Sequence, residues 1–333
     1  MRMRLLVAKG GATYDMTPLV ESVTWSGRKS SAPRTLEVSM LDSDRLGHNR
    51  PGIDVEEGHQ CAFYWDDREL FRGIFMRQQQ KKGRVATFKA YDNAVYLANN
   101  SDTFVYKKQT ATQIFNDICT NFSWAHTAVD TGYVITDHTM PNTSAIDCIW
   151  SALAKTYKAT GNRYYVVSDK GVLKLIARAD NVKQWVIEEG SNLLDFEREK
   201  SIEEVRTRVK LLSDANQVLA EAVSGGVESK IGVMQHTEDS DAKESRAKLQ
   251  SIADALLNNL VRPKESFTLE CLGIPDVTSG IAVWVRVPFL NLQQTFYVDE
   301  DSHTFEMNAH TMSLTLNATN DVEGLDKLKD EET

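Results

Sequence analysis

The most ligand-like side chains of the sequence lie near its end, in the run Asp299-Glu300-Asp301-x-His303. Carboxylates and imidazole can together bind a divalent metal ion. The run lies between two strand-like segments, however, where acidic residues commonly solvate a turn. We therefore interpret it as a turn, and we interpret Asp66-Asp67 and Asp42-x-Asp44 in the same way. No metal site is predicted from these residues.

The remaining candidates for chemistry do not form a recognisable set. No histidine pair has H-E-x-x-H spacing, and no G-x-S-x-G, P-loop or G-x-G-x-x-G run is present. Nothing singles out a pair of carboxylates for glycoside cleavage. The sequence predicts no catalytic residue, no cofactor and no metal. The four cysteines lack C-x-x-C spacing, which favours buried, reduced thiols; they are Cys61, Cys119, Cys148 and Cys271.

Composition and charge narrow the class of protein. The chain has 333 residues, 41% of them hydrophobic, and a formal net charge of −9. Binding to a phosphate backbone needs clustered Lys and Arg, and the densest basic clusters here are short, at Lys107-Lys108 and at 81–84. Dedicated nucleic-acid binding is therefore disfavoured. The apolar stretch Leu5 to Ala8 is shorter than a signal-peptide core, and we interpret it as the first strand of a protein that folds in the cytoplasm.

The first hundred residues have the pattern of β-strands. Residues 19–26 and 34–41 alternate between apolar and polar, and Leu36, Val38 and Met40 share one face. Further strand-like runs at 60–66, 69–80 and 84–91 are separated by turns, and Gly10-Gly11 has the character of a hairpin turn. The pattern indicates a first antiparallel β-barrel domain over residues 1–100.

The middle of the chain changes character. Thr110-x-x-Gln113 has the spacing of a capping box before an amphipathic helix. A second helix begins near Thr143-Ser144 and ends at Gly161, and a β-hairpin turns at Asp169-Lys170-Gly171. These elements predict an α+β insertion domain over residues 101–195.

The last third returns to β. Strand-like runs cover 204–212, 229–235, 265–272, 281–287, 294–299 and 303–316, with Gly225-Gly226 as a hairpin turn and one helix at about 242–260. They predict a second β-barrel domain over residues 196–318. The remaining residues, 319–333, form an acidic tail that we expect to be mobile. The six tryptophans are expected in the core or in subunit interfaces.

Three segments together resemble a known family. The first is Leu70-Phe-Arg-Gly-Ile-Phe75, followed by Ala86 to Asp92 and then Tyr96-Leu97. The second runs from Lys107 to Ile118. The third joins Leu272 to Gly280 with Phe296-Tyr-Val-Asp299, His303-Thr-Phe305 and Thr311 to Leu316. In this order they resemble the XkdQ/YqbQ-type baseplate hub proteins of contractile phage tails and phage-tail-like bacteriocins.

The resemblance implies a structural function. Hub subunits of this kind form a ring, typically a trimer, whose two barrels per subunit match a hexameric tail tube to a trimeric central spike. The implied partners are copies of the chain, the tail tube or tube-initiator protein, the spike and baseplate wedge proteins. DNA would be only passing cargo, and only if the particle is an infectious phage. The protein itself would not insert into a membrane, and its mature location would be the virion or tail-like particle.

Three residues are our candidates for fold-defining positions: Gly73, Asp92 and Gly280. One departure from the family pattern is that Ser279-Gly280-Ile281 replaces the usual Pro-Gly-Asp, so the acidic residue is missing. Two other functions stay open from the sequence. The chain could be a tail-associated cell-wall hydrolase, for which residues 101–195 offer the available place, or a host-receptor-binding module.

Overall fold

The computed structural model describes residues 2–29, 32–41, 55–80, 85–177, 182–213, 215–240, 242 and 245–317. The chain divides into two compact units, Met1–Phe196 with Thr268–Thr333, and Glu197–Phe267. None of the helices in the described part is long and apolar enough to cross a membrane. The acidic tail predicted over 319–333 and the Asp42-x-Asp44 turn lie outside the described residues.

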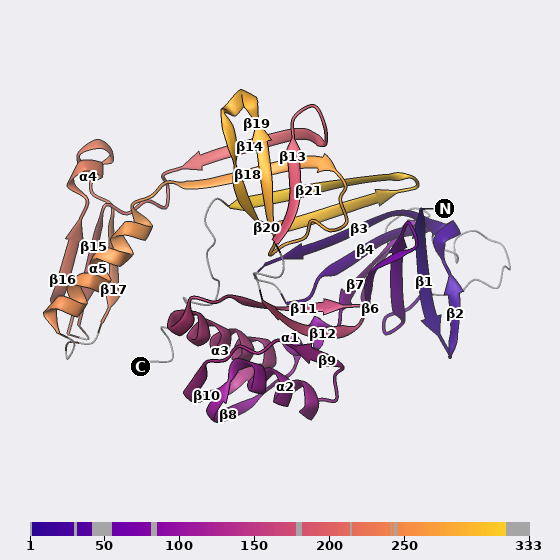
Figure 1. Cartoon of the computed structure of the whole chain (residues 1–333), viewed down its shortest axis with the longest axis horizontal. Coiled ribbons are helices and arrows are strands. Elements are labelled where there is room, and N and C mark those ends of the chain that lie inside the picture. Colours follow the sequence, from indigo (N-terminus) through magenta and orange to yellow (C-terminus); the bar gives the residue numbers. More distant parts are fainter. Residues whose placement is uncertain are drawn as a thin grey trace. The chain divides into compact units, whose positions relative to one another are not determined.

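A thirteen-stranded sheet dominates the first unit (Figure 1). It combines strands from both ends of the chain, because β20 pairs antiparallel with β3. Its main path is, in order, β14 (Leu193–Ser201), β18 (Lys264–Leu272), β21 (Ala309–Asn317), β20 (Leu292–Glu306), β3 (Val20–Arg28), β4 (Thr35–Leu41), β7 (Val85–Asp92), β6 (Arg68–Gln80), β5 (Gln60–Trp65), β1 (Met3–Lys9) and β2 (Ala12–Asp15). Off this path, β13 (Val182–Glu188) pairs with β19 (Ala282–Val287), which pairs with β20.

The N-terminal strands form where apolar and polar residues alternate. Leu36, Val38 and Met40 of β4 are all buried, as predicted, because one face of the strand covers the core. Asp66 and Asp67 form the turn between β5 and β6, both with positive φ. Gly10 and Gly11, also with positive φ, connect β1 to β2. These turn predictions are confirmed.

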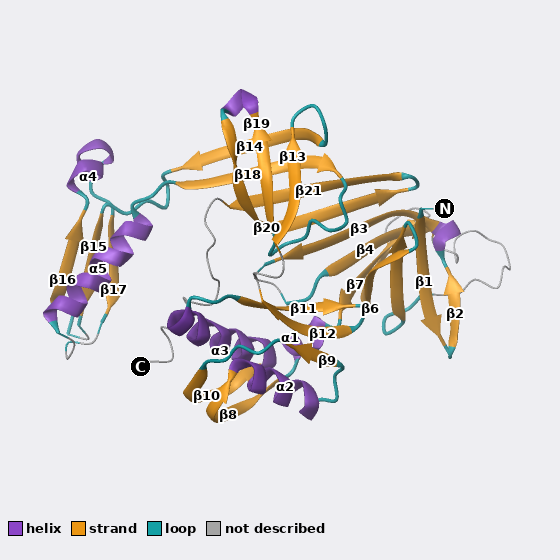
Figure 2. Cartoon of the chain, in the orientation of Figure 1, coloured by secondary structure: helices purple, strands orange, loops and turns teal. Residues whose placement is uncertain are grey.

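The middle of the chain forms the predicted mixture of helices and strands. Thr110 and Gln113 make the reciprocal capping box before α2 (Ala111–Asn121). The other helices here are α1 (Ala94–Asn99) and α3 (Ala145–Thr160), which ends at Gly161 in the left-handed conformation. The strands are β8 (Ser101–Thr110), β9 (His126–Ala128), β10 (Val134–Ser144), β11 (Tyr164–Asp169) and β12 (Val172–Ala177). Figure 2 shows α2 and α3 beside the pair β8–β10.

The second unit is a small α+β layer with its own core. Its sheet has the order β16 (Val218–Val223), β15 (Arg208–Leu212) and β17 (Gln235–Asp239). Helix α5 (Arg246–Leu260) buries Leu249, Ala253 and Leu257 against Val209 and Leu211. The helix predicted at about 242–260 is confirmed, with its start at Arg246.

Two local predictions are wrong. Gly225-Gly226 and part of 229–235 form the short helix α4 (Gly225–Ile231) and not a hairpin and strand. Glu228 of this helix pairs with Arg208 of β15, with 2.9 Å between Nη2 and Oε1, a tertiary contact that local alternation cannot reveal. The runs 294–299 and 303–316 are not separated by an acidic turn, because β20 continues through Asp301 and His303 to Glu306.

The chain is therefore β-rich with a mixed α+β region in its middle, as the sequence predicts. The two barrels and their domain limits stay predictions. The predicted range 196–318 contains the whole second unit and, in addition, several strands of the large sheet.

Candidate functional site

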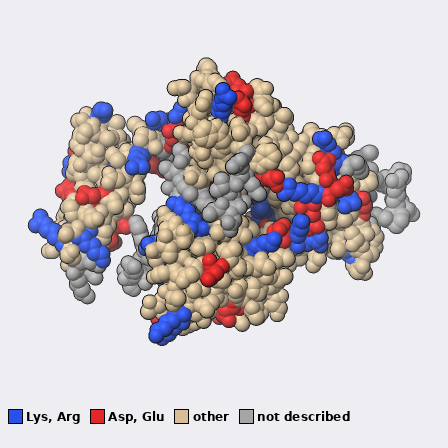
Figure 3. Space-filling view, in the orientation of Figure 1, with Lys and Arg blue, Asp and Glu red and all other residues tan. Residues whose placement is uncertain are grey.

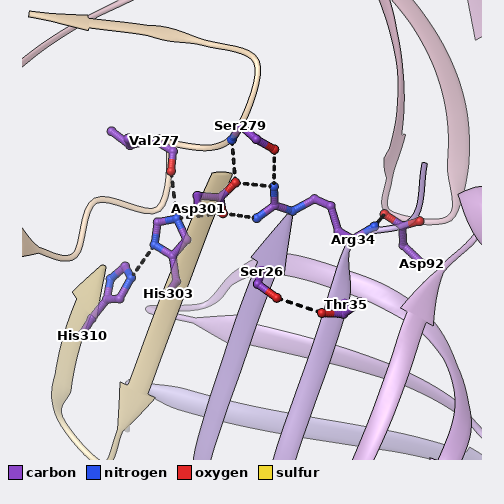
Figure 4. Close-up of polar contacts among 9 residues, drawn as sticks. All are labelled: Ser26, Arg34, Thr35, Asp92, Val277, Ser279, Asp301, His303 and His310. Carbon is purple, nitrogen blue, oxygen red and sulfur yellow. Dashed lines mark hydrogen bonds and ion pairs between the residues drawn. The ribbon is translucent and has the colours of Figure 1, made fainter. Parts of the chain in front are cut away.

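A buried ion pair joins the first and last β regions of the chain (Figure 4). Arg34 immediately precedes β4, and Asp301 lies in β20, the strand that pairs with β3. Arg34 Nη1 donates to Asp301 Oδ1 at 2.8 Å, and Nη2 donates to Oδ2 of the same carboxylate. Such bidentate geometry is the strongest form of ion pair between protein side chains. Ser279 adds a backbone N–H to Asp301 Oδ1 at 2.6 Å.

The surroundings of Arg34 fix the position of its guanidinium. Its Cζ lies 4.1 Å from the ring centroid of Trp25, a distance typical of a cation–π contact. Gly27 pairs directly with Asp301 across β3 and β20. A Cβ at position 27 would lie 2.2 Å from Arg34 Nη1, so the glycine leaves the space that the guanidinium occupies.

Two histidines continue the network on the β20–β21 side. His303 is 0% exposed, and its Nε2 lies 2.8 Å from the carbonyl oxygen of Val277. Since a carbonyl only accepts, Nε2 of His303 carries the proton and Nδ1 is the acceptor. His310 Nε2, 3.0 Å from that Nδ1, therefore donates to it. The hydrogen bonds thus assign one neutral tautomer to each ring.

Burial and charge determine which groups ionise. Burial lowers the pKa of His303 to about 4, and burial with the neighbouring His303 lowers the pKa of His310 to about 3. Burial alone would raise the pKa of Asp301, but the Arg34 guanidinium, His303 and the Ser279 N–H hold it below its ordinary value. At neutral pH the network consists of one ion pair and two neutral rings.

Asp92 lies at the other end of Arg34. Its Oδ2 accepts from the backbone N–H of Arg34 at 3.1 Å, and its Oδ1 accepts from the backbone N–H of Ala94 at 2.9 Å. Burial raises the pKa of Asp92 to about 7, and these two bonds oppose the rise only in part. Asp92 therefore connects the end of β7 to the start of α1 and to Arg34.

The two glycines predicted as fold-defining occupy constrained positions. A Cβ on Gly73 would lie 2.1 Å from the carbonyl oxygen of Tyr91, because β6 and β7 approach closely there. Gly280 has φ of +93° and donates its N–H to the carbonyl of Val298. Ile281 is 1% exposed, so the position where the family usually has aspartate holds a buried apolar side chain. The assignments of Gly73, Asp92 and Gly280 stay predictions.

A cavity of about 410 Å³ lies beside this network. Trp25, Arg34, Asp92 and Gly280 line it together with residues 165–169 of the α+β region. Several charged side chains around it form ion pairs, as in Arg68–Asp276 at 2.6 Å and Lys174–Asp169 at 2.7 Å. The arrangement is that of a structural junction between regions.

The described residues contain no group of three His, Cys, Asp or Glu side chains able to hold a metal ion. Asp301 and His303 are close, with 3.4 Å between Oδ2 and Nε2. However, Asp301 is bound to Arg34 and His303 to the carbonyl of Val277. All four cysteines are buried and form no disulfide. Burial raises the pKa of Cys119 and Cys271 to about 12 and that of Cys61 further, which keeps these thiols protonated and poorly nucleophilic.

A second feature is a hydroxyl-rich face on the sheet, opposite the side that buries Asp301 and His303. Ser302 pairs with Ser313 and with Ser26, and Thr304 pairs with Thr311 and with Thr24. The Oγ atoms of Ser26 and Thr35 share a hydrogen bond of 2.8 Å. We call this surface the hydroxyl face; its members, all half-buried, are Thr24, Ser26, Thr35, Ser302, Thr304, Thr311, Ser313 and Thr315.

The sequence pointed to Asp301 and His303 but assigned them to a turn, which is wrong because both lie inside β20. Arg34, Trp25, Gly27 and His310 were not recognised. The available signal was Asp-x-His at alternating positions in a β-rich run, which directs both side chains to one face of a strand. Arg34, far away in the sequence, gave no local sign of being their partner.

The sequence and structure comparisons relate the chain to proteins of phage-like elements and prophages. A model of the YqbQ-like family matches residues 23–317. The phage-like element PBSX protein XkdQ of Bacillus subtilis is 34% identical over 301 residues, covering 89% of this chain and 91% of that protein. Among solved structures, the 43 kDa tail protein of prophage MuSo2 from Shewanella oneidensis has a TM-score of 0.70 at 14% identity, over 94% of this chain and 96% of that chain. A tail protein from Neisseria meningitidis has a TM-score of 0.67 at 14% identity, over 98% and 99%.

Proposed function

The chain belongs to the YqbQ-like family of phage tail-type proteins, and we propose that it is the hub subunit of a contractile-tail baseplate. In this proposal it forms a ring, typically a trimer, that joins the hexameric tail tube to the trimeric spike. Its function is structural, and it occupies the virion or tail-like particle after assembly in the host cytoplasm. The tube or tube-initiator protein, the spike and wedge proteins are its partners.

The observation that carries this proposal is the single sheet built from both ends of the chain. Strand β3 pairs with β20, and the buried Arg34–Asp301 pair crosses the same boundary. An adaptor under contractile force needs its N-terminal and C-terminal β regions fixed relative to each other. A continuous ladder of backbone hydrogen bonds with a bidentate ion pair beside it supports that requirement.

The charge distribution supports DNA as passing cargo and not as a bound ligand. The net charge is −9, and on the face drawn in Figure 3 acidic and basic side chains of the described residues are interspersed. We further propose that the hydroxyl face borders the central channel. Its hydroxyl side chains are short and uncharged, and the charged residues on the same face offset one another, since Arg28 pairs with Glu300 and Glu37 lies opposite Lys89. Such a face offers a polyanion neither the counterion release that drives phosphate binding nor strong repulsion.

The test is the assembly state of the purified chain, alone and with its tube and spike proteins. Light scattering should give the mass of a trimer, and electron microscopy should show a closed ring with the hydroxyl face toward the hole. Because partners can drive assembly by mass action, a monomer alone does not decide the matter. A closed ring of another order, or clearing of peptidoglycan in a zymogram, would contradict the proposal.

A further inference from the structure

The two-stranded sheet of the α+β region leaves a strand edge open. In the part of the chain that the structure describes, β8 pairs with β10 and with no other strand. Alternate residues of β8 therefore direct their backbone N–H and C=O groups away from β10. An open edge of this kind is a template for pairing with another extended chain.

The free edges of the two strands differ. On β10, Pro141 has no N–H, a register shift falls between Met140 and Thr143, and Asn142 has a φ of +48°. These features interrupt pairing, as they do on protected edges. On β8 the register with β10 is regular from Val105 to Lys107, and the first positive φ is that of Lys108 at +54°. Lys107 and Lys108, which are exposed, protect the end of β8, so the edge of β8 is the better template over residues 102–106.

A groove of about 420 Å³ follows the same strand. On one side it is lined by residues 102–106 of β8, and on the other by Asp117, Ile118, Asn121 and Phe122, at the end of α2. Tyr106 donates a hydrogen bond from its hydroxyl to Asp117 Oδ2 at 3.0 Å, which links strand to helix. A strand added to β8 would direct every second side chain into this space.

The charge of the groove selects among possible strands. Asp102 and Asp117 are exposed and line it, and among the residues that the structure describes no Lys or Arg does so. The polar side-chain donors that Asp117 has here, Tyr106 and Asn121, are both neutral. A basic side chain on the incoming strand would place a positive charge beside two carboxylates that lack a cationic partner in the lining.

We propose that the β8 edge and the groove beside α2 form a docking site for an extended segment of a partner protein. The segment adds antiparallel or parallel to β8 and carries Lys or Arg at alternating positions. Main-chain hydrogen bonds supply the affinity, and the two carboxylates supply the preference for basic side chains. The inference does not depend on the hub proposal, because the site lies within the α+β region.

The probe is a labelled peptide of three Lys-Val repeats, blocked at both ends, titrated into the full chain by fluorescence anisotropy. We expect saturable binding that falls at least tenfold for the same peptide with alternate backbone nitrogens methylated. A Glu-Val peptide should not bind. Equal binding of the methylated peptide would overturn strand addition, and equal binding of the Glu-Val peptide would overturn the charge preference.

Variants of the chain separate the site from general charge effects. Asp117→Lys should lower the affinity for the Lys-Val peptide at least tenfold. Asp195→Lys makes the same change on an exposed residue of β14 and should leave that affinity unchanged. Val105 is 57% exposed in the wild-type chain. Its replacement, Val105→Pro, should abolish binding of the Lys-Val peptide and leave the circular dichroism spectrum unchanged. If Val105→Pro instead dissolves a dimer of the chain, the edge is occupied by a second copy and the partner proposal fails.

Discussion

Two buried carboxylates at the two ends of Arg34 experience opposite environments. Asp92 and Asp301 are both 3% exposed, so solvent access does not distinguish them. Asp301 faces the guanidinium of Arg34, and its pKa lies below the ordinary value. Asp92 faces two backbone N–H groups, and its pKa rises to about 7. Arg34 therefore binds Asp301 directly through its guanidinium, whereas it binds Asp92 through its backbone N–H and its charge acts on that carboxylate only weakly.

The difference shows what a buried carboxylate needs in order to stay ionised. Desolvation disfavours the charged form at both positions. A bidentate cation reverses that effect at Asp301, whereas two neutral donors at Asp92 do not. The first site can act as a permanent connection between β regions, and the second changes its protonation near neutral pH.

The largest effect is expected from Arg34→Met, which leaves the Asp301 charge buried without a cation. We expect the free energy of unfolding to fall by about 3–5 kcal/mol, the usual cost of breaking a buried pair. Urea denaturation measures it. The control is Arg28→Met, whose partner Glu300 lies at 2.7 Å on the same pair of strands but is 43% exposed; a loss of at most about 1 kcal/mol is expected there. Equal losses of unfolding free energy in Arg34→Met and Arg28→Met would show that the buried pair is no more important for stability than the exposed one.

The next prediction concerns pH and Asp92. Because its folded pKa, about 7, exceeds that of an unfolded aspartate, its contribution to stability is complete below about pH 4 and is lost as the pH rises through 7. Between pH 4 and pH 7 the free energy of unfolding should fall by about 1.4 kcal/mol per pH unit because of Asp92. Asp92→Asn should remove it, which stability curves measured at several pH values will show.

His303 and His310 change the stability with pH in the opposite direction to Asp92, so their contribution must be separated from that of Asp92. The folded pKa values of His303 and His310 are lowered to about 4 and 3, so their contribution is complete above about pH 6.5 and is lost as the pH falls through those values. They are present in both wild type and Asp92→Asn, so the difference between the two curves isolates Asp92. A difference independent of pH between 4 and 7 would contradict the assignment.

The smallest effect is expected from Gly27→Ala. The new Cβ would meet Arg34 Nη1 and displace the guanidinium from Asp301, which should cost about 1–3 kcal/mol, as overpacking usually does. The same change in the Arg34→Met background should cost clearly less, because the clashing atom is gone. A double-mutant cycle measures this coupling, and additive losses would show that Gly27 acts independently of the pair.

Much of the local structure was predictable from the sequence. The strand β4, the capping box at Thr110 and Gln113, and the end of α3 at Gly161 were predicted and observed. In each case the cause is local: alternation along a strand, a reciprocal side-chain cap, or a residue free to adopt positive φ. The same local reasoning failed at Asp301 and His303, because both side chains are buried and a buried acidic or imidazole group is stable only with polar partners, which here lie elsewhere in the sequence.

The sequence by itself determined that the chain is β-rich, that a mixed region interrupts it, and that its ordered motifs resemble those of a tail hub family. Periodicity and capping depend on residues within a few positions of one another, so they can be recognised in one dimension. The tertiary structure alone decided that β3 pairs with β20, that Arg34 meets Asp301 across 267 positions, and that β8 has no second strand partner among the described residues, where its edge lies beside α2. Those features depend on which surfaces meet after folding, and burial together with the partners it brings then sets the charge state of each group.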